Sequence, residues 1–93
     1  MTKNDIATRL AKQLQEEGMT TSLAIKAVNE VLQILQQSLK NKETIYLRGF
    51  ATIDTVVRKA HKGYDFHKKK IVHVPERRIV RLTTSKEFTD SIN

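Results

Sequence analysis

Cysteine is absent from this 93-residue chain, which contains one proline and three glycines. Without cysteine, neither a disulfide framework nor a thiolate metal site can form. With so little glycine and proline there is no flexible linker, so residues 1–93 are predicted to form a single domain. Long apolar runs are also lacking, because residues 1–19 alternate polar and apolar side chains at helical spacing. We therefore expect a soluble protein of the cytoplasm with no membrane partner.

Enzyme signatures are missing as well. The sequence has no nucleophile elbow, no phosphate-binding glycine loop and no carboxylate pair. His61, His67 and His73 recur at six-residue intervals, but no cysteine or grouped carboxylates accompany them to complete a metal site. Phosphate contact or plain exposure is the better interpretation of these histidines. We expect no catalysis, no metal or other cofactor, and no small-molecule substrate.

Positive charge is what the sequence has in excess. It has 17 Lys and Arg against 10 Asp and Glu, a net charge of +7. Residues 1–45 contain six basic and five acidic side chains, whereas residues 46–93 contain eleven and five. Such an excess indicates a polyanionic partner. Charge alone does not separate DNA from RNA or from an acidic membrane.

The nearly neutral part of the chain, 1–42, is predicted to form two helices. The first has a capping pair at its start, an apolar stripe and a glycine stop: Thr2 with Asp5, then Ile6, Leu10 and Leu14, then Gly18. Thr20 or Thr21 can cap the second helix, whose apolar side chains cover more than one narrow face. Periodicity leaves open whether that wide stripe packs on a sheet of the same chain or on a second subunit.

From Glu43 onward the hydrophobic period shifts from 3.6 toward 2, which is typical of strands. We expect a sheet made of 43–57 and 76–84, with a tight turn around Arg48 and Gly49 in its first part. Thr84-Ser85-Lys86-Glu87 has the form of a capping box and predicts a short helix over 84–93. The fold class predicted is therefore α+β.

A basic stretch, 58–75, lies between the second and third expected strands; we call it the arm. Its sequence, RKAHKGYDFHKKKIVHVP, has six Lys or Arg against a single acidic residue, Asp65. One interpretation is a solvated, mobile loop, because runs of like charge are usually exposed. The β-branched residues Val56–Val57 and Ile71–Val74 favour another, two long strands that form a projecting β-ribbon. Lys and Arg on the edges of such a ribbon could follow a groove lined by phosphates.

The segment Ile45–Ile53, IYLRGFATI, resembles the V-x-L-x-G-F-G-x-F signature of the bacterial HU and IHF histone-like DNA-bending proteins. Gly49 and Phe50 are its most specific matches, and the resemblance covers essentially the whole chain. Further positions agree without gaps: Arg58, Gly63, Pro75 and Arg78. The resemblance implies an intertwined dimer with two N-terminal helices, a three-stranded antiparallel sheet, an extended β-ribbon arm and a short C-terminal helix. Two such arms would wrap the minor groove of the duplex and bend it.

The chain departs from this family in its core and at the arm tip. The core changes are apolar exchanges that repacking can absorb: Ala51, Ile53 and Leu82. At the tip the family commonly has Arg-Asn-Pro, whose proline inserts between base pairs, and counting back from Pro75 places Tyr64-Asp65-Phe66 there. Phe66 is therefore predicted to be the intercalating residue. Alternatively, Phe66 pins the hairpin against Tyr64 or Ile71, or one of those two is the wedge.

We expect the partner to be double-stranded DNA in the nucleoid, bound by a homodimer or by a heterodimer with a related subunit. The residues expected to contact DNA are Arg48, Arg58, Lys59, His61, Lys62, Tyr64, Phe66, Lys68, Lys69, Lys70, His73, Pro75, Arg77, Arg78 and Arg81. The expected dimer interface comprises Val28, Val31, Leu32, Leu35, Phe50 and Leu82. One alternative is a basic RNA-binding or ribosome-associated protein whose tip aromatics stack on unpaired bases, although no RNP or KH motif is present. Another is an arm that binds protein partners or anionic lipid.

Overall fold

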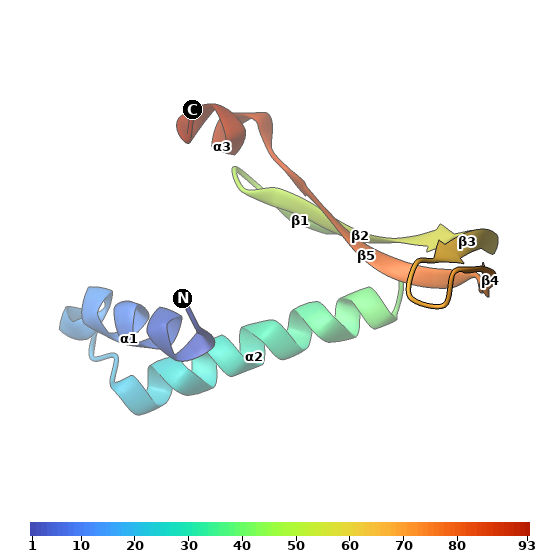
Figure 1. Cartoon of the computed structure of the whole chain (residues 1–93). Coiled ribbons are helices and arrows are strands. Elements are labelled where there is room, and N and C mark those ends of the chain that lie inside the picture. Colours follow the sequence, from blue (N-terminus) through green and yellow to red (C-terminus); the bar gives the residue numbers. More distant parts are fainter. The chain divides into compact units, whose positions relative to one another are not determined.

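A computed structural model describes residues 1–93, which divide into two compact units, 1–37 and 38–93. The helical part contains α1 (Lys3–Gln13), a short 3₁₀ turn (Gln15–Glu17) and α2 (Thr21–Lys40) (Figure 1). Both helices were predicted. The 3₁₀ turn was not, and it carries the chain from the end of α1 to Gly18, whose φ of +87° ends the first helical segment as expected.

Side-chain caps set the starts of both long helices. The N–H of Thr2 donates to Oδ2 of Asp5 at 2.8 Å, and the N–H of Asp5 donates to Oγ1 of Thr2 at 3.3 Å. This reciprocal pair is the predicted capping box. Of the two candidate caps for α2, Thr20 is the one used, because its Oγ1 accepts a hydrogen bond from the N–H of Leu23 at 3.1 Å.

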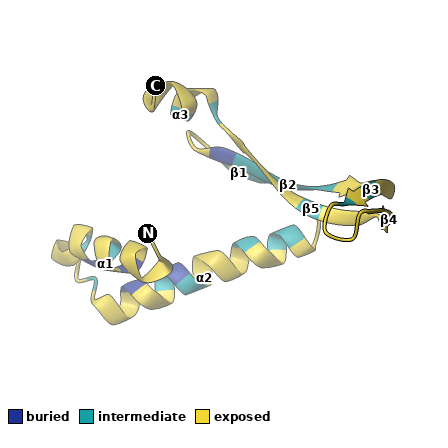
Figure 2. Ribbon diagram, viewed as in Figure 1, coloured by how far each residue is buried: buried dark blue, intermediate teal, exposed yellow.

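The core of the helical unit is small and built from short side chains. Its buried members are Ala7, Ala11, Ala24 and Val28, with Leu10 and Met19 partly buried against them. Short side chains let two helices approach closely, but they bury little apolar surface. Figure 2 shows that most of α1 and α2 is exposed or only half-buried.

The second unit contains a three-stranded antiparallel sheet with strand order β1-β2-β5. Its strands are β1 (Ile45–Leu47), β2 (Ala51–Arg58) and β5 (Arg77–Thr84). The turn between β1 and β2 is as tight as predicted, since the N–H of Phe50 donates to the carbonyl of Leu47 at 2.9 Å. Gly49 adopts a φ of +79° in that turn, where a side chain would be strained.

The chain ends in α3 (Lys86–Ser91), which is docked against the β1–β2 turn. The N–H of Ser85 donates to the carbonyl of Phe50 at 2.8 Å, and the rings of Phe50 and Phe88 lie 5.2 Å apart. The predicted capping box is wrong in one detail. Ser85 is the N-cap, one residue later than predicted, and its Oγ accepts from the N–H of Phe88 at 3.1 Å. Glu87 then lies at the second helical position, too early to reach back to the cap.

The arm forms a second ladder, β3 (His61–Asp65) paired with β4 (Lys70–Val74). The predicted pair of long strands is therefore interrupted, at residues 59–60 and 75–76. Pro75 accounts for the break, because it has no N–H to contribute to a ladder. The register nevertheless continues: Arg58 pairs with Arg77 and His61 with Val74, so equal numbers of residues separate the two ladders on each strand.

None of the three helices combines the length and the hydrophobicity that crossing a membrane requires.

Candidate nucleic-acid interface

Strand alternation divides the sheet into two chemically different faces. Successive side chains on a strand point to opposite sides, and paired residues share a side. We call one side the apolar face; it carries Ile45, Leu47, Ala51, Ile53, Val57, Val80 and Leu82, with Thr55, Arg78 and Thr84 between them. We call the other the polar face; it carries Tyr46, Thr52, Asp54, Arg58, Arg77, Arg81 and Thr83, with Val56 and Ile79 between them. Only the polar face offers charge and hydrogen-bonding groups over most of its area.

The arm has two faces as well, and only one is covered. Val72 and Val74 are half-buried on one side, where they lie over Gly63; a Cβ on that glycine would approach Val74 Cγ2 to 3.3 Å. The opposite side, which we call the exposed face of the arm, carries Lys62, Tyr64, Ile71 and His73. Tyr64 is 50% exposed and Ile71 69% exposed there. Exposed apolar groups flanked by basic ones are typical of a binding surface.

The uninterrupted register connects these surfaces. Arg58 pairs with Arg77 and His61 pairs with Val74, and two residues separate these pairs on each strand. Because the numbers are equal, alternation continues through the break. The polar face of the sheet is therefore continuous with the exposed face of the arm. Pro75 belongs to the same side, between Arg77 and His73.

The tip turn, residues 66–69, is organised by Asp65. Its Oδ1 accepts hydrogen bonds from the N–H groups of His67 at 2.9 Å and Lys68 at 3.2 Å. Lys69 closes the turn with a φ of +51°. The ring of Phe66 is 80% exposed and touches the ring of Tyr64 in an edge contact, with centroids 4.9 Å apart and planes at 74°.

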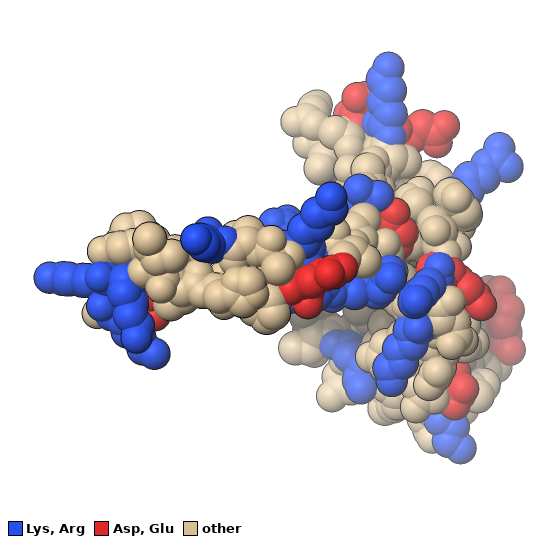
Figure 3. All heavy atoms as spheres, turned by 90° about the vertical axis from the view of Figure 1, so that its right-hand side faces the viewer, with Lys and Arg blue, Asp and Glu red and all other residues tan.

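All the residues predicted to contact DNA are exposed. Basic side chains project from several sides of the extended segment on the left of Figure 3. Their groupings differ: Lys68 and Lys69 lie in the tip turn and Lys70 opens β4 beside them. Arg48 lies in the β1–β2 turn, apart from the arm. His61 and Lys59 lie on the side of the arm that continues the apolar face of the sheet. His67 lies in the tip turn.

Two of the predicted arginines are engaged by the protein itself. Arg81 Nε and Nη2 donate to Asp54 Oδ1 at 3.1 Å and Oδ2 at 2.7 Å, in a bidentate pair between directly opposed residues. That hydrogen bond holds the pKa of Asp54 below its ordinary value. Arg78 lies on the apolar side, where its Nη1 donates to Thr55 Oγ1 at 2.9 Å. Neither arginine is as free for phosphate as Arg58 or Arg77.

Sequence reasoning missed Tyr46, whose side chain is 78% exposed on the polar face. The alternation of Ile45, Tyr46 and Leu47 was the available signal, because it places the tyrosine opposite the two apolar residues. It also missed Asp54, because counting charges does not reveal that this residue pairs with Arg81.

The residues predicted to form the dimer interface are mostly uncovered in the single chain. Val31 is 55%, Phe50 45% and Leu82 52% exposed, and Leu32 and Leu35 are less so. Val28 differs, since it is 8% exposed and belongs to the core of its own helical unit.

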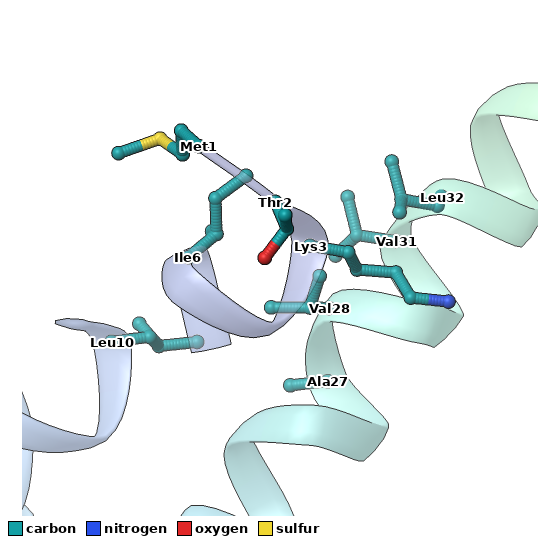
Figure 4. A pocket seen from close by; sticks show the side chains of 9 residues that line it. All are labelled: Met1, Thr2, Lys3, Ile6, Leu10, Ala27, Val28, Val31 and Leu32. Carbon is teal, nitrogen blue, oxygen red and sulfur yellow. The ribbon is translucent and has the colours of Figure 1, made fainter. Parts of the chain in front are cut away.

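A pocket of about 420 Å³ lies beside Val28, between α1 and α2 (Figure 4). Its wall is almost entirely apolar and includes Ile6, Leu10, Ala27, Val28, Val31 and Leu32. In Figure 4 the side chains of Ile6 and Leu10 from α1 face the same space as Val28 and Val31 from α2.

Comparison with known proteins agrees along the whole chain. The family described as bacterial DNA-binding protein matches residues 1–93. DNA-binding protein HRL53 of Rhizobium leguminosarum is 33% identical over 93 residues, covering all of this chain and 99% of the relative. DNA-binding protein HU of Clostridium pasteurianum is 27% identical with the same coverage, and integration host factor subunit beta of Laribacter hongkongensis is 28% identical, with 92% of the relative covered.

Solved structures agree in fold. A cocrystal structure of Anabaena HU with DNA superposes with a TM-score of 0.86 at 18% identity, over 99% of this chain and 97% of that one. A mutant of transcription factor 1 gives a TM-score of 0.63 at 20% identity, over 98% and 89%. The α+β fold with its basic arm and the full-length match together show that this chain belongs to the bacterial DNA-binding protein family of HU and integration host factor.

Proposed function

We propose that this protein is an architectural component of the nucleoid that binds double-stranded DNA as a dimer, places its arms in the minor groove and bends the duplex. The observation that carries the proposal is the continuous surface formed by the polar face of the sheet and the exposed face of the arm. One such surface can follow a duplex from the body of the protein to the tip of the arm.

The chemistry of this surface suits DNA of any sequence. Arg58, Lys62 and Arg77 can contact phosphates, which fixes position on the duplex but carries no sequence information. Tyr64 and Ile71 present apolar surface between these charges, and a minor groove entered by a ribbon can accommodate it. We therefore expect affinity with little base preference.

Phe66 is proposed as the wedge that enters a base step. It occupies the tip, it is exposed, and no core is available to cover it. Phenylalanine is among the residues that minor-groove proteins insert, and the unstacking that insertion requires costs a few kcal/mol, offset by contacts that a bent duplex makes with the body.

A dimer is proposed because Val57, Val80 and Leu82 of the apolar face are exposed in the single chain, and because an apolar pocket lies between the two long helices. Val31, Leu32, Leu35, Phe50 and Leu82 are the proposed contacts, whereas Val28 belongs to the core of its own helical unit and also lines the pocket. A homodimer is the simplest assembly. A heterodimer with a related subunit is also compatible, since three relatives are named as subunits of integration host factor.

The decisive experiment measures binding and bending separately. A labelled duplex should be displaced from the protein by unlabelled duplex DNA and not by equal amounts of single-stranded RNA or anionic vesicles. Displacement by RNA alone would support the RNA-binding alternative. Fluorescence transfer between dyes at the two ends of a duplex of about 30 base pairs reports the bend. This length is chosen because bending one such site costs roughly 1 to 6 kcal/mol.

Phe66→Ala should reduce that bend and weaken binding to intact linear duplex more than binding to nicked DNA, which is already kinked. Ile71→Ala is the matched control, because Ile71 is also exposed and apolar but lies away from the tip turn. Equal losses on both substrates with an unchanged bend would show that Phe66 does not intercalate. A lost bend in Ile71→Ala alone would move the wedge to Ile71.

A further inference from the structure

The negative charge of Asp65 is opposite to that of every other charged residue in the arm. Asp65 is the single acidic side chain in the arm, residues 58–75, which carries six Lys or Arg. A carboxylate at the tip of a phosphate-binding ribbon repels the ligand, so its charge does not favour binding. Its structural use is visible instead: Oδ1 accepts two backbone N–H groups of the tip turn, from His67 and Lys68.

These two hydrogen bonds determine how the tip turn is presented. Asp65 ends β3, Phe66 follows it, and the next two N–H groups are those bound by the carboxylate. An aspartate that bonds backbone N–H groups two and three residues ahead mimics a backbone turn and defines the path of the residue between. Here that residue is Phe66. The left-handed Lys69, with a φ of +51°, is the other constraint on the turn.

The Phe66 ring is supported without being covered. Its edge contact with Tyr64, at 4.9 Å between centroids, holds one side, yet 80% of its surface remains exposed. A phenylalanine on a loose hairpin tip would lose much conformational freedom on entering a base step. One that is already held in place loses less, and this difference appears as affinity and as bending.

We propose that Asp65 is a positioning residue, which holds the tip turn so that Phe66 is presented against Tyr64 and ready for insertion before DNA is bound. The proposal rests on the wedge role of Phe66 given above. It assigns to the carboxylate oxygen, and not to its charge, the task of organising the tip.

The test compares two substitutions of the same residue in the full chain. Asp65→Asn keeps an oxygen that can accept both N–H groups and removes the charge, whereas Asp65→Ala removes both. We expect Asp65→Ala to reduce the bend and to weaken binding to linear duplex about fivefold. That is the size of one ordinary hydrogen bond, although two are removed, because part of their loss falls on the free tip turn and not on binding. Binding to nicked DNA should change less. Asp65→Asn should retain the bend and bind at least as tightly as the parent.

Amide exchange at His67 and Lys68, measured by NMR without DNA, reports the turn directly. It should accelerate in Asp65→Ala and stay slow in Asp65→Asn. An Asp65→Asn variant that loses the bend as Asp65→Ala does would overturn the proposal, since charge would then matter more than the acceptor. The proposal would also be overturned if Asp65→Ala bent DNA fully while Phe66→Ala did not. In that case Phe66 would still be the wedge, but Asp65 would not position it. A Phe66→Ala variant that bends normally would instead remove the proposed wedge.

Discussion

Arg81 lies on the polar face of the sheet, but Asp54 neutralises its charge through two hydrogen bonds. An aspartate is already ionised at neutral pH, and because the same contact lowers the pKa of Asp54, the pair persists to a more acidic pH than an unpaired aspartate would allow. Exposed pairs of this kind add little stability. Its main effect is on the charge that the surface offers: one of the three arginines of the polar face is already occupied.

Replacing Asp54 with asparagine should therefore strengthen DNA binding. Arg81 would be released toward phosphate, and the slope of log affinity against log salt should become steeper by about 0.9 for each additional phosphate that a subunit binds. Affinity measured by titration at several salt concentrations tests this. Asp90→Asn in α3 is the control, because it removes the same charge without a partner arginine. Identical slopes for the two variants would show that Arg81 does not reach the duplex.

Residue-level features differ in how far the sequence reveals them. Caps and left-handed glycines depend on neighbours within four residues, and Thr2, Asp5, Gly18 and Gly49 were predictable for that reason. The pair of Arg81 with Asp54 joins residues 27 positions apart and depends on strand register, which charge counts do not contain. The choice of Ser85 over Thr84 as a cap depends on where β5 ends, which propensity locates only to within a few residues.

At the scale of elements, the arm is a ribbon attached through an interrupted ladder. The β-branched residues correctly indicated strands, and Pro75 determined where pairing stops. The side on which each arm residue lies could not be predicted without the register. That register puts Tyr64 and Ile71 on the exposed face of the arm, and Val72 and Val74 on the opposite, covered side.

The lysine run of the arm supplies a test at this scale. We expect the triple variant Lys68→Gln, Lys69→Asn and Lys70→Gln to flatten the salt dependence by about 0.9 for each phosphate that the arm no longer binds. Asparagine is chosen at position 69 because it tolerates the left-handed backbone there. The thermal midpoint should hardly change, since all three side chains are exposed.

A variant with Lys12, Lys26 and Lys40 changed to Gln has the same net charge and leaves the arm intact. If both triple variants lowered the slope equally, long-range charge and not direct binding by the arm would explain the effect.

At the scale of the whole molecule, one chain by itself buries only a small apolar core. Its buried apolar residues are Ala7, Ala11, Ala24, Val28 and Ala51, and no large side chain is fully buried. Small domains are marginal even with well-filled cores. Folding and dimerisation are therefore expected to occur together, with a thermal midpoint that rises with protein concentration.

Phe50→Ala tests this coupling. Phe50 is 45% exposed in the single chain, where its ring also contacts Phe88, so a partner can cover a little less than half of the side chain. If it becomes a core residue of the dimer, truncation should cost about 3–5 kcal/mol and produce unfolded or dissociated protein. Sedimentation of the parent, of Phe50→Ala and of Tyr46→Ala, an exposed aromatic of the polar face, separates damage to the interface from general damage. A folded parent monomer at micromolar concentration would contradict the dimer.

The register shared by the two ladders restricts the lengths that the arm can take. Removing one residue from each strand, such as Ala60 and Pro75, would turn every side chain beyond that point to the opposite side. Tyr64 and Ile71 would then leave the surface that continues from the sheet. Removing two residues from each strand would preserve the faces and shorten the reach by about 7 Å, at about 3.4 Å per residue. Natural variation and engineering can therefore adjust the span of DNA covered by this arm in steps of two residues per strand without reversing its faces.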